Sequence, residues 1–219
     1  MRTDNGPRRA AVGRPMGPQP AKRQAILEAA VAVFLREGYT RAGVDVIADE
    51  ARVSKQTVYN HFGDKERLFI AAVEGERERV AAEFATGAPC VPEQFDGGDA
   101  RTALTALGHR VLEVLLDERA SALRRLVIAE VARHPALRPA CAEGEPQQLV
   151  VWLAGMLDRR TGSGELSVPD PLAAAQQFVA LLVQQGLYQS MYGTRPIAAE
   201  TAASICEKAA DLFVRAYRT

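Results

Sequence analysis

The sequence has few cysteines, and those it has are scattered. Cys90, Cys141 and Cys206 are odd in number, lie far apart in the 219 residues, and belong to no CxxC motif. This usage excludes a disulfide framework and a cysteine-based metal site, and it predicts a reduced, cytoplasmic environment. We expect each cysteine to behave as a small buried apolar residue.

Long apolar runs are also missing. No stretch reaches the roughly 18 apolar residues of a membrane span, and no apolar block follows the N-terminal arginines as it does in a secretory signal. The motifs GxSxG and HExxH, a Walker-type loop and a strand-linked GxGxxG are absent as well. We therefore predict no membrane partner, no metal or cofactor, and no enzymatic activity; an enzyme remains the alternative from another class.

Charge is balanced over the whole chain but not along it. Lys and Arg number 27, as do Asp and Glu, so the formal net charge is zero. Residues 1–63, however, hold 10 basic against 6 acidic side chains, and the remainder holds 17 against 21. The N-terminal part is therefore basic, which favours an acidic partner for that part of the chain.

The apolar pattern divides the chain into three parts. Residues 1–20 contain four prolines and three glycines with little to bury, and we expect a disordered tail. Its Arg8, Arg9 and Arg14 either reach a DNA minor groove as an arm or are simply solvated. From residue 21 onward the apolar residues recur at helical spacing, without the alternation typical of strands. We predict an all-α fold with a small domain at 21–68 and a larger helical domain at 69–219.

The segment "VDVIADEARVSKQTVYNHFGDKERLF", residues 44–69, contains two short helical patterns separated by only three residues. The first ends at Ala51, and Ser54 is a favourable N-cap for the second. In the second pattern only Val58 and Phe62 are firmly inward residues. Two short helices with a three-residue turn between them, the second polar on its outer face, are typical of a helix-turn-helix.

The outer face of that second helix carries hydrogen-bonding side chains rather than the Glu and Lys typical of a solvated surface. Gln and Asn can pair bidentately with adenine, and a Thr methyl can touch thymine. Lys, Tyr and a helix N-terminus can bind phosphates. The candidate DNA-binding residues are Ser54, Lys55, Gln56, Thr57, Tyr59, Asn60, His61 and Lys65.

The stretch "AILEAAVAVFLREGYTRAGVDVIADEARVSKQTVYNHFGDKERLF" closely resembles the N-terminal DNA-binding domain of TetR/AcrR-type transcriptional regulators, over about residues 22–75. The resemblance implies base contacts from Lys55, Gln56, Thr57 and Asn60, and phosphate contacts from Ser54, Tyr59, His61 and Lys65. It further implies a homodimeric repressor that binds a palindromic double-stranded DNA operator and is released by a small-molecule effector. A helical adaptor that acts through protein contacts, with weak or no specific DNA binding, is the alternative.

Two places depart from the family's pattern. Ala42 and Gly43 stand where Thr or Ser usually caps the first motif helix and touches a phosphate. Gly43 can still serve as the N-cap, at a cost of a few tenths of a kcal/mol. Arg52 stands where Gly usually allows a left-handed backbone in the turn, so we expect strain of roughly 1 kcal/mol at that position.

The remaining chain is similar to the family's ligand-binding domain in its helical layout and length. The candidate pocket residues are Leu107, His109, Val111, Leu126, Glu130, Trp152, Met156 and Phe178, with ordinary core packing as the competing interpretation. Candidates for a four-helix dimer interface lie on the last two helices: Ala173, Ala174, Ala175, Ala202, Ala203, Ala209 and Ala210, with Phe178, Leu182 and Phe213. Periodicity alone fits the chain's own core equally well, and the resemblance favours the dimer.

Overall fold

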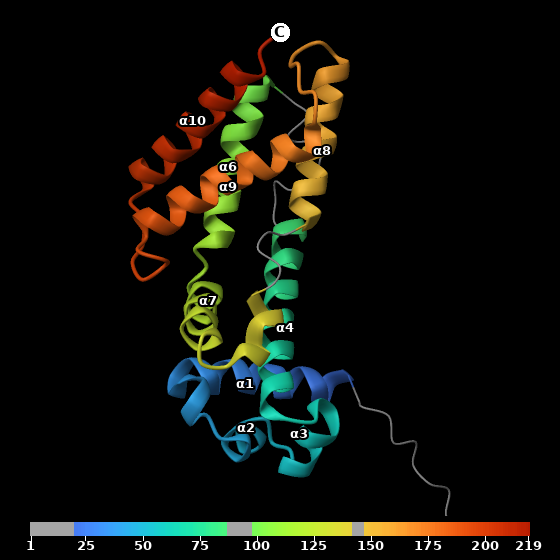
Figure 1. Cartoon of the computed structure of the whole chain (residues 1–219), viewed down its shortest axis with the longest axis vertical. Coiled ribbons are helices and arrows are strands. Elements are labelled where there is room, and N and C mark those ends of the chain that lie inside the picture. The colour runs from blue at the N-terminus through green and yellow to red at the C-terminus, as the bar shows by residue number, and fades with distance from the viewer. Residues whose placement is uncertain (1–19, 87–97, 142–146) are drawn as a thin grey trace, which may run out of the picture.

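The computed structural model describes residues 20–86, 98–141 and 147–219, and over these ranges the chain is helical (Figure 1). In chain order the helices are α1 (Pro20–Arg41), α2 (Val44–Glu50), α3 (Lys55–Phe62), α4 (Lys65–Thr86), α6 (Ala100–Leu115), α7 (Glu118–Val131), the short 3-10 helix η1 (Pro135–Cys141), α8 (Gln147–Gly162), α9 (Pro171–Gln189) and α10 (Ala199–Ala216). The predicted all-α fold is confirmed, since the described ranges hold no strand beyond an isolated bridge between Leu166 and Arg218. Within the same ranges no helix is long and apolar enough to span a bilayer. The predicted tail, apart from Pro20, lies outside the described residues.

Helices α1 to α3 and the first half of α4 form a small unit that we call the head. In its core the ring of Phe34 stands edge-on to that of Phe69, with 4.9 Å between the centroids, and Tyr39 packs against both rings. The sequence pattern predicts that the first helix ends at Gly38, and the backbone of that glycine is indeed non-helical; the range of α1 reaches Arg41 because a further short helical stretch follows the kink. Gly38 has a φ of 77°, which glycine adopts at little steric cost. The kink carries Tyr39 into the core, where it is 5% exposed.

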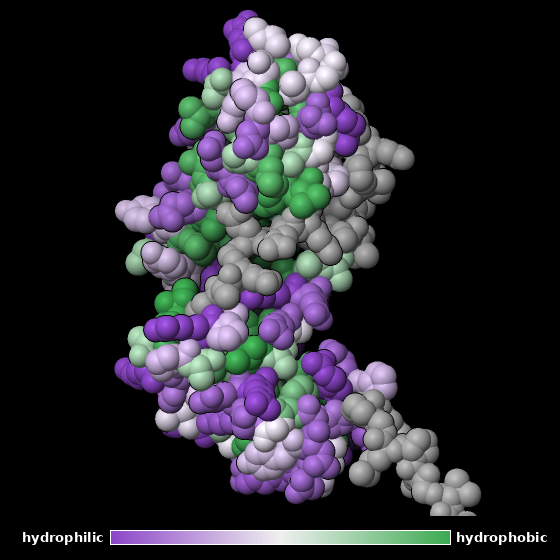
Figure 2. Space-filling model, turned by 45° about the vertical axis from the view of Figure 1, so that its right-hand side comes forward, coloured by the Kyte–Doolittle hydropathy of each residue, from purple (hydrophilic) through white to green (hydrophobic). Residues whose placement is uncertain are grey.

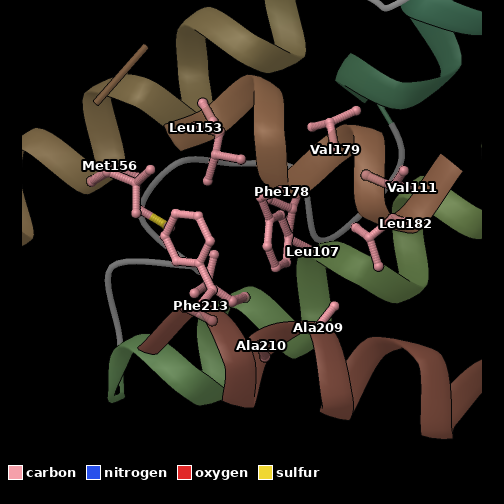
Figure 3. Packing of buried hydrophobic residues seen from close by; sticks show 14 of the residues in the cluster. Leu107, Val111, Leu153, Met156, Phe178, Val179, Leu182, Ala209, Ala210 and Phe213 are labelled. Atoms are coloured by element: carbon pink, nitrogen blue, oxygen red, sulfur yellow. The ribbon is translucent and has the colours of Figure 1, made fainter. Parts of the chain in front are cut away.

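Helices α6, α8, α9 and α10 form a second unit, which we call the body. Figure 3 shows side chains from all four helices converging on its core, where Phe178 and Phe213 meet edge to face at 5.3 Å. Helices α6 and α10 approach closely, because a Cβ on Gly108 would lie only 3.2 Å from the Sγ of Cys206. Cys206 is buried as predicted, and burial raises the pKa of its thiol to about 11, which keeps the sulfur protonated and unreactive.

Helix α4 leads from the head toward the body, and α7 lies between the two units (Figure 1). The apolar residues Leu123 and Val127 of α7, with Leu137 of η1, belong to the core of the head. The packing of α7 therefore does not follow the division of the chain at residue 68. Sequence periodicity identifies the apolar face of a helix, but it does not say which unit that face packs against.

A buried carboxylate fixes α4 against the start of α7. Glu76 is 5% exposed and forms ion pairs with Arg79 at 2.6 Å and with Arg119 at 3.1 Å. Arg79 also reaches Asp117, the N-cap of α7, at 3.1 Å. Because removing one partner of a buried ion pair leaves an uncompensated charge, this network favours a single relative position of the two helices.

Candidate nucleic-acid interface

The turn between α2 and α3 is fixed by backbone hydrogen bonds. The amide of Arg52 donates to the carbonyl oxygen of Asp49 at 3.0 Å, and that of Val53 donates to Ala48 at 2.9 Å. Arg52 has a φ of 55°, so the left-handed backbone expected at this position is confirmed. Gly43 is the N-cap of α2, with an extended backbone and without a side-chain capping bond, as also expected.

Ser54 caps α3 and is already engaged within the motif. Its Oγ accepts a hydrogen bond from the amide of Thr57 at 3.1 Å, which satisfies one of the free N–H groups at the helix start. The same Oγ lies 2.8 Å from the Oγ1 of Thr57. A phosphate contact from the hydroxyl of Ser54 therefore competes with two internal hydrogen bonds.

The outer face of α3 is polar and accessible. Val58 and Phe62 are buried against the rest of the head, as predicted, whereas Lys55, Gln56, Tyr59 and Asn60 are exposed and Thr57 and His61 are half-buried. The helix lies at the end of the molecule opposite the C-terminus (Figure 1). In the view of Figure 2 the surface at that end is largely hydrophilic. The structure thus brings the polar α3 candidates together on one surface.

Two of these side chains are bonded to each other. The Nε2 of Gln56 donates to the Oδ1 of Asn60 at 2.9 Å, across one turn of α3. Residues four apart on a helix are neighbours, so the bond holds both amide groups side by side on the exposed face.

Lys65 differs from the other candidates because it turns back into the protein. Its Nζ donates to the carbonyl oxygen of Thr40 at 3.1 Å and lies 4.9 Å from the centroid of the Tyr39 ring. Burial lowers the pKa of Lys65 below its ordinary value, while the carboxylate of Glu130 acts in the opposite direction. Burial and nearby carboxylates raise the pKa of Tyr39 to about 12. A phosphate contact from Lys65 therefore requires it to leave this site.

The sequence interpretation missed a further cation beside α3. Arg23, near the start of α1, is exposed and places its guanidinium carbon 5.4 Å from the centroid of the Phe62 ring. A long basic side chain that lies on an aromatic ring beside the polar face of α3 can reach a DNA phosphate. In the sequence, the only indication of this cation is the pair of adjacent basic residues, Lys22 and Arg23, at the start of a predicted helix.

The candidate pocket residues fall into separate places. Leu107, Val111, Met156 and Phe178 are buried together in the body core, and Trp152 packs against them half-buried. His109 is exposed on α6. Leu126 and Glu130 belong to α7 and lie at the head, where the Oε2 of Glu130 is 3.7 Å from the Nε2 of His134 and the ring of His134 packs against Tyr39 at 4.9 Å. The eight residues therefore do not line one cavity, because α7 turns its inner face to the head.

Most of the residues proposed for a dimer interface lie in the core of their own chain. This holds for Ala174, Ala175, Ala209, Ala210, Phe178, Leu182 and Phe213, whereas Ala173, Ala202 and Ala203 are half-buried. The competing interpretation, own-core packing, is correct for the seven buried residues. A groove of about 610 Å³ runs between the outer sides of α9 and α10 instead. It is lined by Leu181, Gln185, Gln189, Glu200, Thr201, Ser204, Ile205, Lys208, Ala209 and Leu212.

The helix-turn-helix head on a helical body defines the class of a DNA-binding transcriptional regulator, and comparisons with known proteins agree. Residues 26–72 match the family model for bacterial regulatory proteins of the tetR family. Residues 102–219 match the C-terminal domain of AefR-like transcriptional repressors. The chain belongs to the tetR family.

Relatives and solved structures support the same assignment. The HTH-type transcriptional regulator Mb1581 of Mycobacterium bovis is 30% identical over 197 residues, which cover 89% of each chain. The HTH-type transcriptional repressor SCO4008 of Streptomyces coelicolor is 38% identical over 77 residues, and this match covers 35% of the chain and 38% of that repressor. A crystal structure of a TetR-family regulator from Mesorhizobium loti superposes with a TM-score of 0.78 at 28% identity, over 92% of this chain and all of that one.

Proposed function

We propose that this transcriptional regulator is a repressor, which binds a palindromic operator as a homodimer and is released when a small molecule binds the body. The observation that carries the proposal is the outer face of α3, where exposed hydrogen-bonding side chains stand on a helix that Val58 and Phe62 anchor in the head. Repression needs only occupancy of a promoter, and the match to an AefR-like repressor domain supports that direction. Such a protein acts in the bacterial cytoplasm, where its operators lie.

The contacts with DNA divide by chemistry. Lys55, Tyr59 and the free N–H groups at the start of α3 are suited to phosphates, which set the register of the helix in the major groove. Gln56, Thr57 and Asn60 are suited to base edges. Arg23 extends the phosphate contacts toward α1. Smaller roles fall to the hydroxyl of Ser54 and the amine of Lys65, because both already form hydrogen bonds within the head. The ring of His61 also has a smaller role, because it is half-buried.

The dimer would form through the outer sides of α9 and α10 rather than through their buried alanines. Leu172, Tyr188 and Leu212 are 50%, 69% and 60% exposed on these two helices. The groove between the helices carries one acidic and one basic side chain, Glu200 and Lys208. In a symmetric pair each of these can face the opposite charge of the second copy, while the exposed apolar side chains are buried.

The effector would bind in the body near Leu107, Val111, Trp152, Met156 and Phe178. In this conformation Leu107 and Met156 have no exposed surface, so binding requires the helices to separate. A ligand that prefers the separated arrangement then shifts the regulator away from its DNA-binding form, and linkage makes the two affinities fall by the same factor.

The proposal is tested by selecting random duplex DNA with the purified full-length chain and sequencing the bound pool over a range of salt concentrations. A palindromic consensus is the expected result. The variant Lys55→Ala/Tyr59→Ala should lose most of the affinity at moderate salt, because it removes phosphate contacts. If that variant binds as well as the wild type, or if no sequence is enriched, α3 is not the DNA-reading element and the adaptor alternative gains support.

A reporter gene placed behind the selected site then tests the direction of regulation. Expression should fall when the chain is produced and recover when a screened ligand is added. Increased expression would identify an activator instead, without changing the role of α3.

A further inference from the structure

The chain between α9 and α10 has an unusual backbone. Met191 and Tyr192 have φ values of 49° and 58°, and Gly193 follows with a φ of 75°. Residues other than glycine adopt this left-handed conformation only at a cost in energy. The side chains of Met191 and Tyr192 are 57% and 56% exposed, so their burial does not offset that cost. Other contacts of residues 190–195, which we call the 190–195 turn, must therefore hold its shape.

Those contacts come from within the turn and from α7. The Nη1 of Arg125 donates to the carbonyl oxygen of Tyr192 at 3.1 Å and to that of Gly193 at 2.6 Å. Within the turn, the amide of Gly193 donates to the Oγ of the buried Ser190 at 2.8 Å. Gly193 also lies against Ser121 of α7, because an added Cβ would be only 2.5 Å from the Cβ of that serine. The turn is therefore docked on α7 by two hydrogen bonds and by a close approach that requires glycine.

Helix α7 contacts the head with its other side. Leu123 and Val127 belong to the core of the head. Residues two apart on an α-helix point about 200° away from each other, so Ser121 and Arg125 face away from that core. Figure 1 shows α7 between the head and the chain that joins α9 to α10. One helix therefore connects the 190–195 turn to the head.

We propose that Arg125 and the 190–195 turn form a latch that fixes the orientation of the head relative to the dimer interface. The latch thereby sets the spacing of the two half-sites that the regulator accepts. This inference rests on the proposed homodimer through the outer sides of α9 and α10, and it deepens that proposal. Because the turn joins these two helices, its contact with α7 ties the interface to the head. The two α3 helices of a dimer then stand at one separation, as binding to two half-sites requires.

The test measures how affinity depends on half-site spacing, using the full-length chain and the palindromic duplex obtained by selection. A second duplex has two base pairs inserted between the half-sites, which rotates one half-site about the DNA axis. Wild-type affinity should fall about 100-fold on insertion, because only one head of the dimer can then bind. Arg125→Ala should bind the original duplex about threefold more weakly and lose only about tenfold on insertion, since its heads are less constrained.

Two glycine substitutions separate the contact with α7 from backbone strain. Gly193→Ala introduces a Cβ at a φ of 75° and against Ser121, so it should relax the spacing dependence as Arg125→Ala does. Gly164→Ala, in the loop between α8 and α9, introduces a Cβ at a similar φ of 78°, but that Cβ would have no neighbour within 4 Å. It should keep the wild-type dependence on spacing.

Arg101→Ala controls for the loss of a positive charge. Arg101 of α6 pairs with Asp211 of α10 at 2.9 Å, so the substitution breaks a contact between two helices of the body. It should leave the spacing dependence unchanged. All variants should bind a duplex with a single half-site as the wild type does, because α3 is unaltered. Urea unfolding and sedimentation establish that each variant is folded and dimeric.

Three results would overturn the inference while leaving the regulator intact. The first is that Arg125→Ala and Gly193→Ala retain the wild-type dependence on spacing. The second is that Gly164→Ala relaxes this dependence as far as Gly193→Ala does. The third is that Arg125→Ala dissociates the dimer, which would assign the contact to association rather than to spacing. Failure of the wild-type chain to enrich any palindrome would instead reject the proposed function, and the inference with it.

Discussion

The outer face of α3 and the outer sides of α9 and α10 are both exposed helical surfaces, but the second exposes more large apolar side chains than the first. On α3 the exposed groups are Lys55, Gln56, Tyr59 and Asn60, and Gln56 and Asn60 are joined by a hydrogen bond. On α9 and α10 they include Leu172 and Leu212, which are 50% and 60% exposed. Polar groups that keep their hydrogen-bonding capacity suit a hydrated, charged partner, and apolar groups suit a second protein surface.

The interiors beneath these surfaces are alike. The head is built on Phe34 edge-on to Phe69 at 4.9 Å, and the body on Phe178 edge-on to Phe213 at 5.3 Å. The comparison teaches that the core determines where a helix lies, while the residues left outside determine what it binds. Substitutions can therefore alter the core and the exposed surface of a helix separately.

The largest effects are expected from emptying either core. Phe34 has no exposed surface and Phe178 is 1% exposed, so Phe34→Ala or Phe178→Ala should each reduce the free energy of unfolding by about 3–5 kcal/mol. The first should abolish DNA binding because α3 loses its support. The second should weaken association of the two copies. Urea unfolding followed by circular dichroism, with sedimentation and DNA titration, measures all three quantities.

Removal of an exposed apolar side chain is the matching control for these two core substitutions. Val151→Ala on α8 removes a side chain that is 64% exposed and lies outside the groove, so its effect on the free energy of unfolding should stay within about 0.5 kcal/mol. If Phe34→Ala and Phe178→Ala impair DNA binding and association to the same extent, the head and the body are not separable units.

The next largest effect concerns association. Leu212→Asp places a charge in the groove between α9 and α10, where Leu212 is 60% exposed, and should leave the monomer's stability nearly unchanged. It should prevent dimer formation and lower the affinity for a two-half-site operator by about 100-fold, because the second head no longer binds at high effective concentration. Val151→Asp on α8, 64% exposed and outside the groove, is the control. Equal behaviour of the two variants in sedimentation would rule out the groove as the interface.

The head could be predicted from its sequence much further than the body. Ser54, Val58 and Phe62 follow local rules of capping and spacing, and the structure agrees with each. The left-handed backbone at Arg52 is an expectation from the family resemblance, which has Gly at this position, and the structure agrees with it. The prediction for Leu126 and Glu130, in contrast, places them in the body, whereas both lie at the head, because helical spacing gives no information about the partner of an apolar face. The contact of Lys65 with Thr40 joins residues from different helices, so spacing within one helix does not reveal it.

A smaller effect is expected at the turn between α2 and α3. Arg52→Gly removes the left-handed strain, which stabilises the head by about 1 kcal/mol. The greater freedom of glycine in the unfolded chain destabilises the head by about 0.5 kcal/mol. The head should therefore gain about 0.5 kcal/mol, visible as a higher urea midpoint. Arg52→Ala keeps the strain and loses the charge, so it should show no gain. Equal stabilisation by both substitutions would attribute the effect to charge rather than to the φ of 55°.

The smallest effect is expected at the N-cap of α2. Gly43→Ser supplies a hydroxyl where the cap has no side-chain bond, and should stabilise the head by a few tenths of a kcal/mol. The new Cβ would lie 2.5 Å from the Oδ1 of Asp45, which must rotate away, and that flexible carboxylate can do so at low cost. Gly43→Ala meets the same neighbour without the capping bond, so serine should exceed alanine by about 1 kcal/mol. A DNA titration of the serine variant then sharpens the comparison of surfaces: higher affinity would extend the phosphate-binding face from α3 to α2, and unchanged affinity would confine it to α3 and its immediate neighbours.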